Sequence, residues 1–316
     1  MKRKVIQLAR KTHVVSLPCK WFREQGLKKG DEVEVIEEGR SLIINNSSSI
    51  KKCVTKISID VSNLTVSLLF IYVNAAYKKG ADEIELLFSN NQAKDPKRNR
   101  VVKTMDIISL ITDRLIGMEI VRQSKNSCLI KEVSSVNEEE FELILNRIFV
   151  TLETMSQDSI DAYVKKDNET LENICQYMEI NINKLTNFCL RILNKFSKQD
   201  SNSIYLIAFL LEDIGDQYTK ISNELSKIKE NKKLVDFLKE SELLLRLSHK
   251  FFSKSDKKYF VEFHKRKLDL KKSINESKLS SEYNQVLNSI CIILDSLMEI
   301  NDSKCILNLD PKEEAC

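Results

Sequence analysis

The chain has 316 residues, of which 42% are hydrophobic and 30% are charged, as in an ordinary globular protein. Six glycines and three prolines are few for this length, so long helices are expected. The longest uninterrupted apolar run, residues 206–211, is too short to cross a bilayer, and the basic N-terminus lacks the apolar segment of a signal peptide. We therefore expect a cytoplasmic protein without membrane insertion.

Positive charge is concentrated at the N-terminus. Residues 1–30 contain nine Lys or Arg and one acidic residue, a net charge of +8, whereas the whole chain carries +4. Clustered cations neutralise phosphates and release counterions, which favours nucleic-acid binding with a steep salt dependence. A solvated basic surface is the alternative on composition alone. The candidate DNA contacts are Arg3, Lys4, Arg10, Lys11, Lys20 and Arg23.

Residues 12–35 predict a strand, a short helix, a glycine turn and a second strand, with a further strand on each side. Pro18 follows a β-branched run at a position where a helix can begin, and Gly26 supplies the left-handed residue that often closes one. Residues 32–35 then alternate polar and apolar side chains, as a half-buried strand does. A unit of roughly 45 residues buries too little apolar surface to fold securely alone, so a partner chain is expected.

Within this unit, SLPCKW followed by GLKKGDEVEV resembles the SpoVT/AbrB swapped-hairpin domain, over residues 4–45. The resemblance implies strands that interleave between two chains, and hence a homodimer that binds DNA. Joined to the charge distribution, it makes DNA the favoured partner of the N-terminal unit.

Residues 47–135 predict a small α+β module after the polar linker NNSSS. Apolar and β-branched runs alternate with two helical patterns, and Gly80 and Gly117 follow the helices. The expected strands are residues 54–60, 83–88, 118–122 and 128–132, and the expected helices are residues 64–79 and 100–115, separated by a loop AKDPKRNR.

Beyond residue 136 the pattern is helical throughout. Three apolar seams with alternating three- and four-residue spacing, over residues 141–155, 171–192 and 204–225, predict a three-helix bundle; Asn181 is part of the second seam. Three more helical segments, near residues 232–252, 257–276 and 282–300, predict a second bundle.

Two carboxylate-bearing pairs stand out in the first of these bundles. Glu212 and Asp216 are four residues apart on one helix face, and Glu179 and Asn183 have the same spacing on the preceding helix. If the helices are antiparallel neighbours, four oxygen donors could converge, an arrangement suited to a hard or borderline cation. The alternative is an acidic surface that is simply solvated.

The same two segments resemble the DxxVN and LERIGD helix motifs of the PhoU family, over residues 136–303. Here they read Glu179, Ile182 and Asn183, and LEDIGD at residues 211–216. The resemblance implies tandem three-helix bundles, a link to phosphate uptake, and a divalent metal or iron at the bundle surface held by Glu179, Asn183, Glu212 and Asp216. In the second repeat Met298 replaces the acid, so at most one metal site is expected.

The expected fold is therefore multidomain and mainly α. A SpoVT/AbrB-like DNA-binding and dimerisation domain with a swapped-hairpin β unit covers residues 1–46, and the α+β linking module covers residues 47–135. A PhoU-like helical domain of two three-helix bundles, the second degenerate, covers residues 136–316.

The leading hypothesis is a homodimeric DNA-binding transcriptional regulator linked to phosphate uptake and homeostasis, whose helical domain senses metal, phosphate status or a partner. The alternative is a PhoU-like interaction protein that restrains a phosphate transporter or a histidine kinase, with the N-terminal unit as a dimer clasp. Metal-dependent hydrolysis is the weakest reading, since no nucleophile, general base or enclosed pocket can be named. We expect no enzymatic activity.

Overall fold

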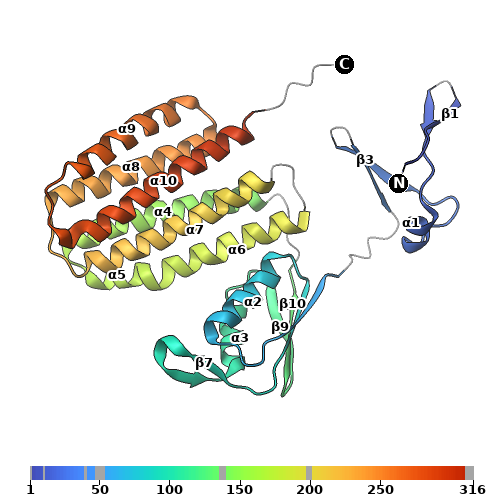
Figure 1. The fold of residues 1–316 in the computed structure, drawn as a ribbon, viewed down its shortest axis with the longest axis horizontal. Coiled ribbons are helices and arrows are strands. Elements are labelled where there is room, and N and C mark those ends of the chain that lie inside the picture. The colour runs from blue at the N-terminus through green and yellow to red at the C-terminus, as the bar shows by residue number, and fades with distance from the viewer. Residues whose placement is uncertain are drawn as a thin grey trace. The chain divides into compact units, whose positions relative to one another are not determined.

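The computed structural model describes residues 2–9, 11–38, 41–46, 54–134, 140–196 and 201–309. The chain divides into two units, residues 1–54 and 55–316. We call the first unit the head; the second contains the α+β module (residues 55–134) and the helical region (residues 140–309), as Figure 1 shows. The predicted boundary after residue 135 falls inside the second unit.

The head consists of two antiparallel hairpins and one short helix. Strand β1 (Ile6–Ala9) pairs with β2 (Thr12–Val14), and β3 (Val33–Glu38) pairs with β4 (Ser41–Asn46). Between them lies α1 (Cys19–Glu24), which is closed as predicted by Gly26, two residues beyond its end, a glycine with φ of +66°. The strand, helix and strand order expected for residues 12–35 is confirmed, whereas an exchange of strands between two chains stays a prediction.

The head has almost no core within one chain. Among head residues whose side chains are described, Leu27 alone is buried. Apolar side chains on both hairpins remain open to solvent, with exposed fractions of 70% for Leu8 and 65% for Leu42. Isolated two-stranded hairpins are marginal in water, because little apolar burial offsets the entropy lost on ordering the chain.

The α+β module is a four-stranded sheet with two helices on one face. Its strands β5 (Lys56–Asp60), β6 (Glu83–Leu87), β9 (Met118–Gln123) and β10 (Ser127–Glu132) lie in the order β5-β6-β10-β9. Only β5 and β6 are parallel, and α2 (Val66–Lys78) connects them. Alternate strand residues such as Ile84 and Ile130 are buried together with Leu69 of α2 and Ile108 of α3 (Thr104–Thr112).

One prediction in this module is wrong. The segment expected to be a loop and the first turn of a helix forms a hairpin of β7 (Ala93–Asp95) and β8 (Arg100–Val102), closed by a 3₁₀ turn at Pro96–Arg98. The buried carboxylate of Asp95 accepts a hydrogen bond from Arg100 Nε at 3.4 Å. This pairing stabilises the hairpin, so α3 begins only at Thr104.

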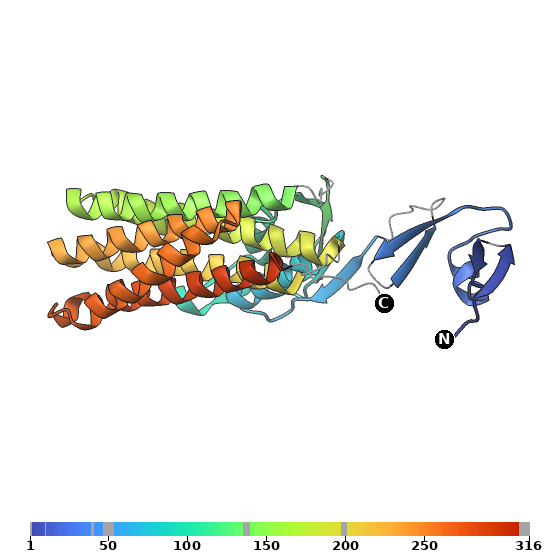
Figure 2. The same ribbon diagram turned by 90° about the horizontal axis from the view of Figure 1, so that it is seen from above.

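The helical region consists of long antiparallel helices in two sets. The first set contains α4 (Glu140–Lys165), α5 (Asn168–Asn173), α6 (Glu179–Phe196) and α7 (Ser201–Leu225); the second contains α8 (Lys232–Lys254), α9 (Lys257–Asn275) and α10 (Asn284–Leu307). Helix α7 packs on α10, and α4 packs on α8, so the two sets share one apolar core (Figures 1 and 2). None of the described helices combines the length and apolar character that a membrane span requires.

A π-helical segment, Ile174–Met178, joins α5 to α6 within the second predicted seam. The seam is confirmed on both sides of it, where Leu171 and Leu185 are buried. One position is wrong: Asn181, which was predicted to lie in the seam, is partly exposed, and its neighbour Ile182 is fully buried. Ile182 packs directly on the backbone of Gly215 in α7: a Cβ atom at Gly215 would lie 3.1 Å from Ile182 Cδ1.

The α+β module is attached to α6 through a buried arginine. The guanidinium of Arg191 is fully buried. Its Nη1 donates a hydrogen bond, 2.9 Å long, to the backbone carbonyl of Tyr77 in the last turn of α2. Its Nη2 lies 3.2 Å from Glu132 Oε1 of β10, and its carbon Cζ stacks 4.8 Å from the centroid of the Tyr77 ring. A buried cation thus has a carboxylate, a carbonyl and an aromatic face as partners.

Lys195, one turn further along α6, extends this contact to the first residue of the second unit. Its ammonium group lies 2.7 Å from both Glu132 Oε2 and Asp82 Oδ1. The other Asp82 oxygen accepts a hydrogen bond from the backbone N–H of Thr55 at 2.8 Å. Burial opposes ionisation of Asp82, but the hydrogen bonds from Lys195 and Thr55 outweigh it and lower the pKa of Asp82.

Replacing Arg191 by methionine tests this attachment. Glu132 would keep Lys195 but lose a buried partner, and removal of one member of a buried ion pair typically costs about 3–5 kcal/mol. We expect Arg191→Met to lower the free energy of unfolding of the second unit by about that amount, as measured by urea denaturation followed by circular dichroism. The exposed Lys239→Met is the control and should change stability by less than about 0.5 kcal/mol. A loss below about 1 kcal/mol in Arg191→Met would contradict the assignment.

A double-mutant cycle tests the close approach of α6 and α7. Gly215→Val places methyl groups against Ile182, and overpacking of this kind costs about 1–3 kcal/mol. Combining it with Ile182→Ala makes room, so the double variant should be more stable than the sum of the two single effects by about 1 kcal/mol or more, measured by the same denaturation. Additive effects would show that the two residues are not in contact.

Candidate functional site

Helices α6 and α7 bring the four predicted oxygen-donor residues to one part of the helical surface. Ile182 of α6 lies against Gly215 of α7, and the acid-bearing positions flank this contact on both helices. The two segments that were singled out by spacing alone therefore do face one another. We call Glu179, Asn183, Glu212 and Asp216 the acidic face.

The carboxylates of the acidic face are electrostatically coupled. Desolvation raises the pKa of Glu179, and the nearby charge of Asp216 raises it further. Desolvation is also the main cause of the raised pKa of Glu212, which additionally lies in the field of Asp216. The side chain of Asp216 is more exposed, yet desolvation raises its pKa as well. Three acids that resist ionisation together form a region where a positive charge would be stabilising.

Asn183 adds an unsatisfied acceptor to the same face. Its Oδ1 atom is buried and has no hydrogen-bond partner within the described residues. Burying a carbonyl oxygen without a hydrogen-bond partner destabilises the fold, typically by about 1–3 kcal/mol, because the oxygen has lost its hydration. A cation, or a water bound to one, would satisfy it.

Three basic residues surround the acidic face without forming ion pairs to it within the described chain. Lys78, from α2 of the α+β module, lowers the pKa of Glu212 by its field, and Arg114, which follows α3, does the same for Glu179. Lys220 acts likewise on Asp216. None of the three was predicted, because each is distant in sequence or lies outside the motif.

The donor chemistry of this face fits a hard divalent cation, but its geometry limits the number of ligands. Among the described residues, no three His, Cys, Asp or Glu side chains are grouped so that they could hold one ion. A cation here would therefore be bound by one or two carboxylates, with water completing its coordination, as Mg²⁺ prefers. The predicted site remains a prediction, and a multi-carboxylate iron cluster receives no support from this arrangement.

Asp213, which stands where the PhoU motif has arginine, faces a different neighbour. Its Oδ2 accepts a hydrogen bond from Ser296 of α10 at 3.2 Å, and its Oδ1 accepts one from Gln217 at 3.2 Å. Asp213, the residue that departs from the motif, therefore connects α7 to α10 of the second helix set.

The predicted DNA contacts of the head are exposed wherever they are described. Arg3 and Lys4 precede β1, and Lys11 lies immediately before β2. Lys20 and Arg23 lie on α1, three residues apart. Lys20 forms a long ion pair with Glu24, at 3.9 Å, with both side chains largely in solvent. Arg10 lies outside the described residues. Their contact with DNA stays a prediction.

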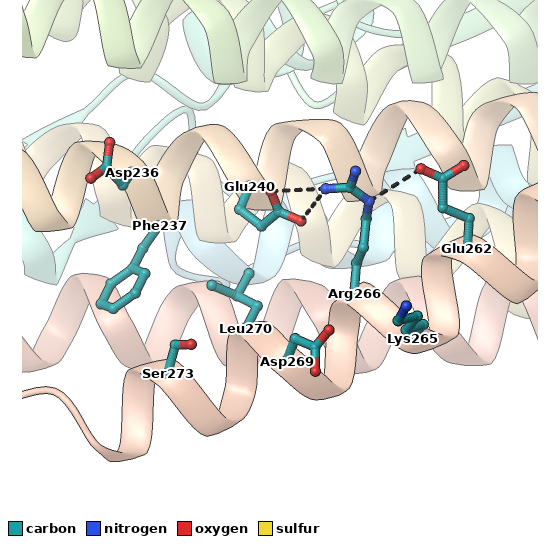
Figure 3. Close-up of a pocket in the computed structure, with 9 residues that line it drawn as sticks. All are labelled: Asp236, Phe237, Glu240, Glu262, Lys265, Arg266, Asp269, Leu270 and Ser273. Atoms are coloured by element: carbon teal, nitrogen blue, oxygen red, sulfur yellow. Dashed lines mark hydrogen bonds and ion pairs between the residues drawn. The ribbon is translucent and has the colours of Figure 1, made fainter.

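A groove of about 510 Å³ lies between α8 and α9, away from the acidic face. Arg266 occupies its centre and donates to Glu240 at 3.0 Å and to Glu262 at 3.1 Å, as Figure 3 shows. The main cation of the groove is therefore already paired with two carboxylates.

Comparison with known proteins supports one of the two predicted resemblances. No curated protein matches the chain. Among solved structures, the phosphate transport system regulatory protein PhoU from Streptococcus pneumoniae is 18% identical, covers 54% of this chain and 94% of its own, and gives a TM-score of 0.45. The SpoVT/AbrB resemblance of the head stays a prediction. Residues 145–225, which contain the whole acidic face, match the family model of the PhoU domain.

Proposed function

We propose that the chain is a non-enzymatic regulator of phosphate uptake that acts by binding a component of a phosphate transporter or a sensor kinase. The observation that carries this proposal is the PhoU domain match over residues 145–225, because that segment includes both helices of the acidic face.

The acidic face is the proposed signal-binding site, and a hydrated divalent cation is its proposed ligand. Helix α6 supplies Glu179 and Asn183 at its first turns, and Arg191 and Lys195 near its end. The same helix therefore connects the acidic face to the α+β module and, through Asp82, to Thr55. A cation that shifted α6 would act on the residue that follows the head, provided it binds two arrangements of α6 with different affinity.

DNA binding by the head is a second candidate function. Two observations favour it: the net charge of +8 over residues 1–30, and the exposed apolar hairpins that a single chain does not bury. A homodimer that covers the hairpins would also join two basic surfaces. In this reading the helical region controls a DNA-binding head.

Complementation of a strain that lacks the gene separates the two candidates. Loss of the gene should leave phosphate uptake high when external phosphate is plentiful, and the full chain should restore control. Residues 55–316 have their own core and should restore control if partner binding is sufficient. If control needs the basic residues of the head, DNA binding is required. Unchanged uptake in the deletion strain would refute the link to phosphate.

Neutralising two acids of the acidic face tests the cation proposal. After dialysis against Mg²⁺ or Mn²⁺, elemental analysis should find metal in the native chain and little in Glu212→Gln/Asp216→Asn, with the exposed Glu172→Gln as the control. Equal metal content in all three proteins would leave only a solvated acidic surface.

The same double variant should change how stability depends on pH when metal is removed with EDTA. The folded chain holds protons on these carboxylates more tightly than the unfolded chain, so their ionisation lowers stability above their ordinary pKa values of 4.5 and 3.8. The native chain should gain stability as pH falls from 7 towards 5. The variant should lack that gain and melt a few degrees higher at pH 7. Identical profiles in thermal unfolding would contradict the raised pKa values.

Binding of the head to DNA should depend on salt through its lysines and arginines. Each lost phosphate contact should reduce the slope of log K against log salt by about 0.9, so Lys4→Ala/Lys11→Ala should show a shallower slope than the native chain in a promoter titration. Lys239→Ala/Lys250→Ala in α8 is the matched control. Equal slopes would remove these two residues from the proposed contact.

Dimerisation of the head has its own readout, because Trp21 is the single tryptophan of the chain and lies in α1. If two chains cover the hairpins together, the unfolding midpoint seen by Trp21 fluorescence should rise with protein concentration. A midpoint independent of concentration would mean that one chain is sufficient.

A further inference from the structure

A small cavity of about 180 Å³ lies at the end of the helical region where α4 and α7 begin and α8 and α10 end. Most of its wall is apolar, and the side chains that form it come from all four helices. They include Phe141, Leu145, Ile207, Phe252 and Leu307. This cavity is distinct from the acidic face and from the α8–α9 groove, since it shares no lining residue with either.

One cation, Lys304 of α10, lines this apolar cavity. Its ammonium group lies 5.0 Å from the centroid of the Phe252 ring, and within the described residues it has no ion pair and no hydrogen bond. Burial lowers the pKa of Lys304, and the field of Glu142, which also lines the cavity, does not compensate for that burial. A half-buried ammonium group without an acceptor is destabilising until an anion pairs with it.

The polar side of the cavity is held in place by a hydrogen-bond network. Asn146 Oδ1 lies 3.1 Å from Ser253 Oγ, its donor, and 3.2 Å from His249 Nε2. The other His249 nitrogen lies 2.8 Å from Glu153 Oε1, and its ring stacks on Phe149 at 4.8 Å. These contacts hold the polar part of the cavity wall in place before any ligand enters.

We propose that this cavity binds a small monocarboxylate with a short apolar body, its carboxylate paired with Lys304 and its body against the apolar wall. The volume corresponds to roughly six water molecules, which suits a ligand of fewer than ten heavy atoms or so and is smaller than pockets for drug-sized molecules. Inorganic phosphate does not fit this chemistry. It needs many donors for its oxygens, and here the polar lining residues besides Lys304 are Asn146, Ser253 and the acidic Glu142.

Calorimetric titration of the full chain with hexanoate tests the proposal. We expect saturable binding of one hexanoate per chain, no competition from phosphate, and much weaker binding of hexanol, which has the same body without the charge. Lys304→Met keeps the length of the side chain and should weaken hexanoate binding about tenfold or more. It should fold at least as well as the native chain, because it removes an unpaired half-buried charge.

Two further variants make the outcome unambiguous. Leu307→Trp should block the cavity sterically, whereas Lys239→Met, far along α8, should bind hexanoate as the native chain does. Absence of saturable hexanoate binding in the native chain would overturn the proposal. Equal binding of hexanoate by Lys304→Met would overturn it too, as would equal affinity of the native chain for hexanol, because the ligand would then not be recognised by its charge.

Discussion

The interaction on which the rest of the second unit depends is the burial of the Arg191 guanidinium between α2 and β10. A fully buried arginine needs partners for its charge and its donors; the carbonyl of Tyr77 and the carboxylate of Glu132 serve Nη1 and Nη2, while Nε has no hydrogen-bond partner within the described residues. Once they are fixed, Lys195 and Asp82 follow, and the start of the unit at Thr55 is tied to the same helix. The α+β module and the helical region are therefore connected by more than the chain itself. They share a buried polar contact formed by Arg191, Tyr77, Glu132 and Lys195.

Because of this contact, the two ends of α6 carry side chains of opposite charge with different partners. Near its beginning are Glu179 and Asn183, whose carboxylate and orphaned oxygen favour a cation, and near its end are the two cations that hold the module. Each of the two proposed functions would depend on this arrangement. A partner-binding regulator would present the acidic face or its neighbourhood to another protein, and a DNA-binding regulator would pass the state of that face towards the head. The element common to both is α6, whose first half belongs to the acidic face and whose second half contacts the α+β module.

Much of this architecture could be predicted because its signals are local. The three- and four-residue spacings located the long helices, Gly26 marked the end of α1, and the four-residue spacing of Glu212 and Asp216 placed both on one face. The partners of those acids could not be predicted in the same way: Lys78 and Arg114 come from another module and meet them only through tertiary packing. The role of Arg191 is equally invisible, since nothing in its neighbourhood distinguishes a buried arginine from a solvated one. Spacing also misplaced Asn181 in the core, where its apolar neighbour Ile182 is buried instead.

The π segment, Ile174–Met178, can be understood as one extra residue that the helix has absorbed. The segment ends immediately before Glu179, the first residue of the acidic face, so that carboxylate stands where the regular hydrogen-bond pattern of α6 begins. π turns of this kind are frequent at functional sites. Insertions and deletions are usually thought of as events in loops, yet here a length difference of one residue is accommodated inside a helix, next to the acidic face.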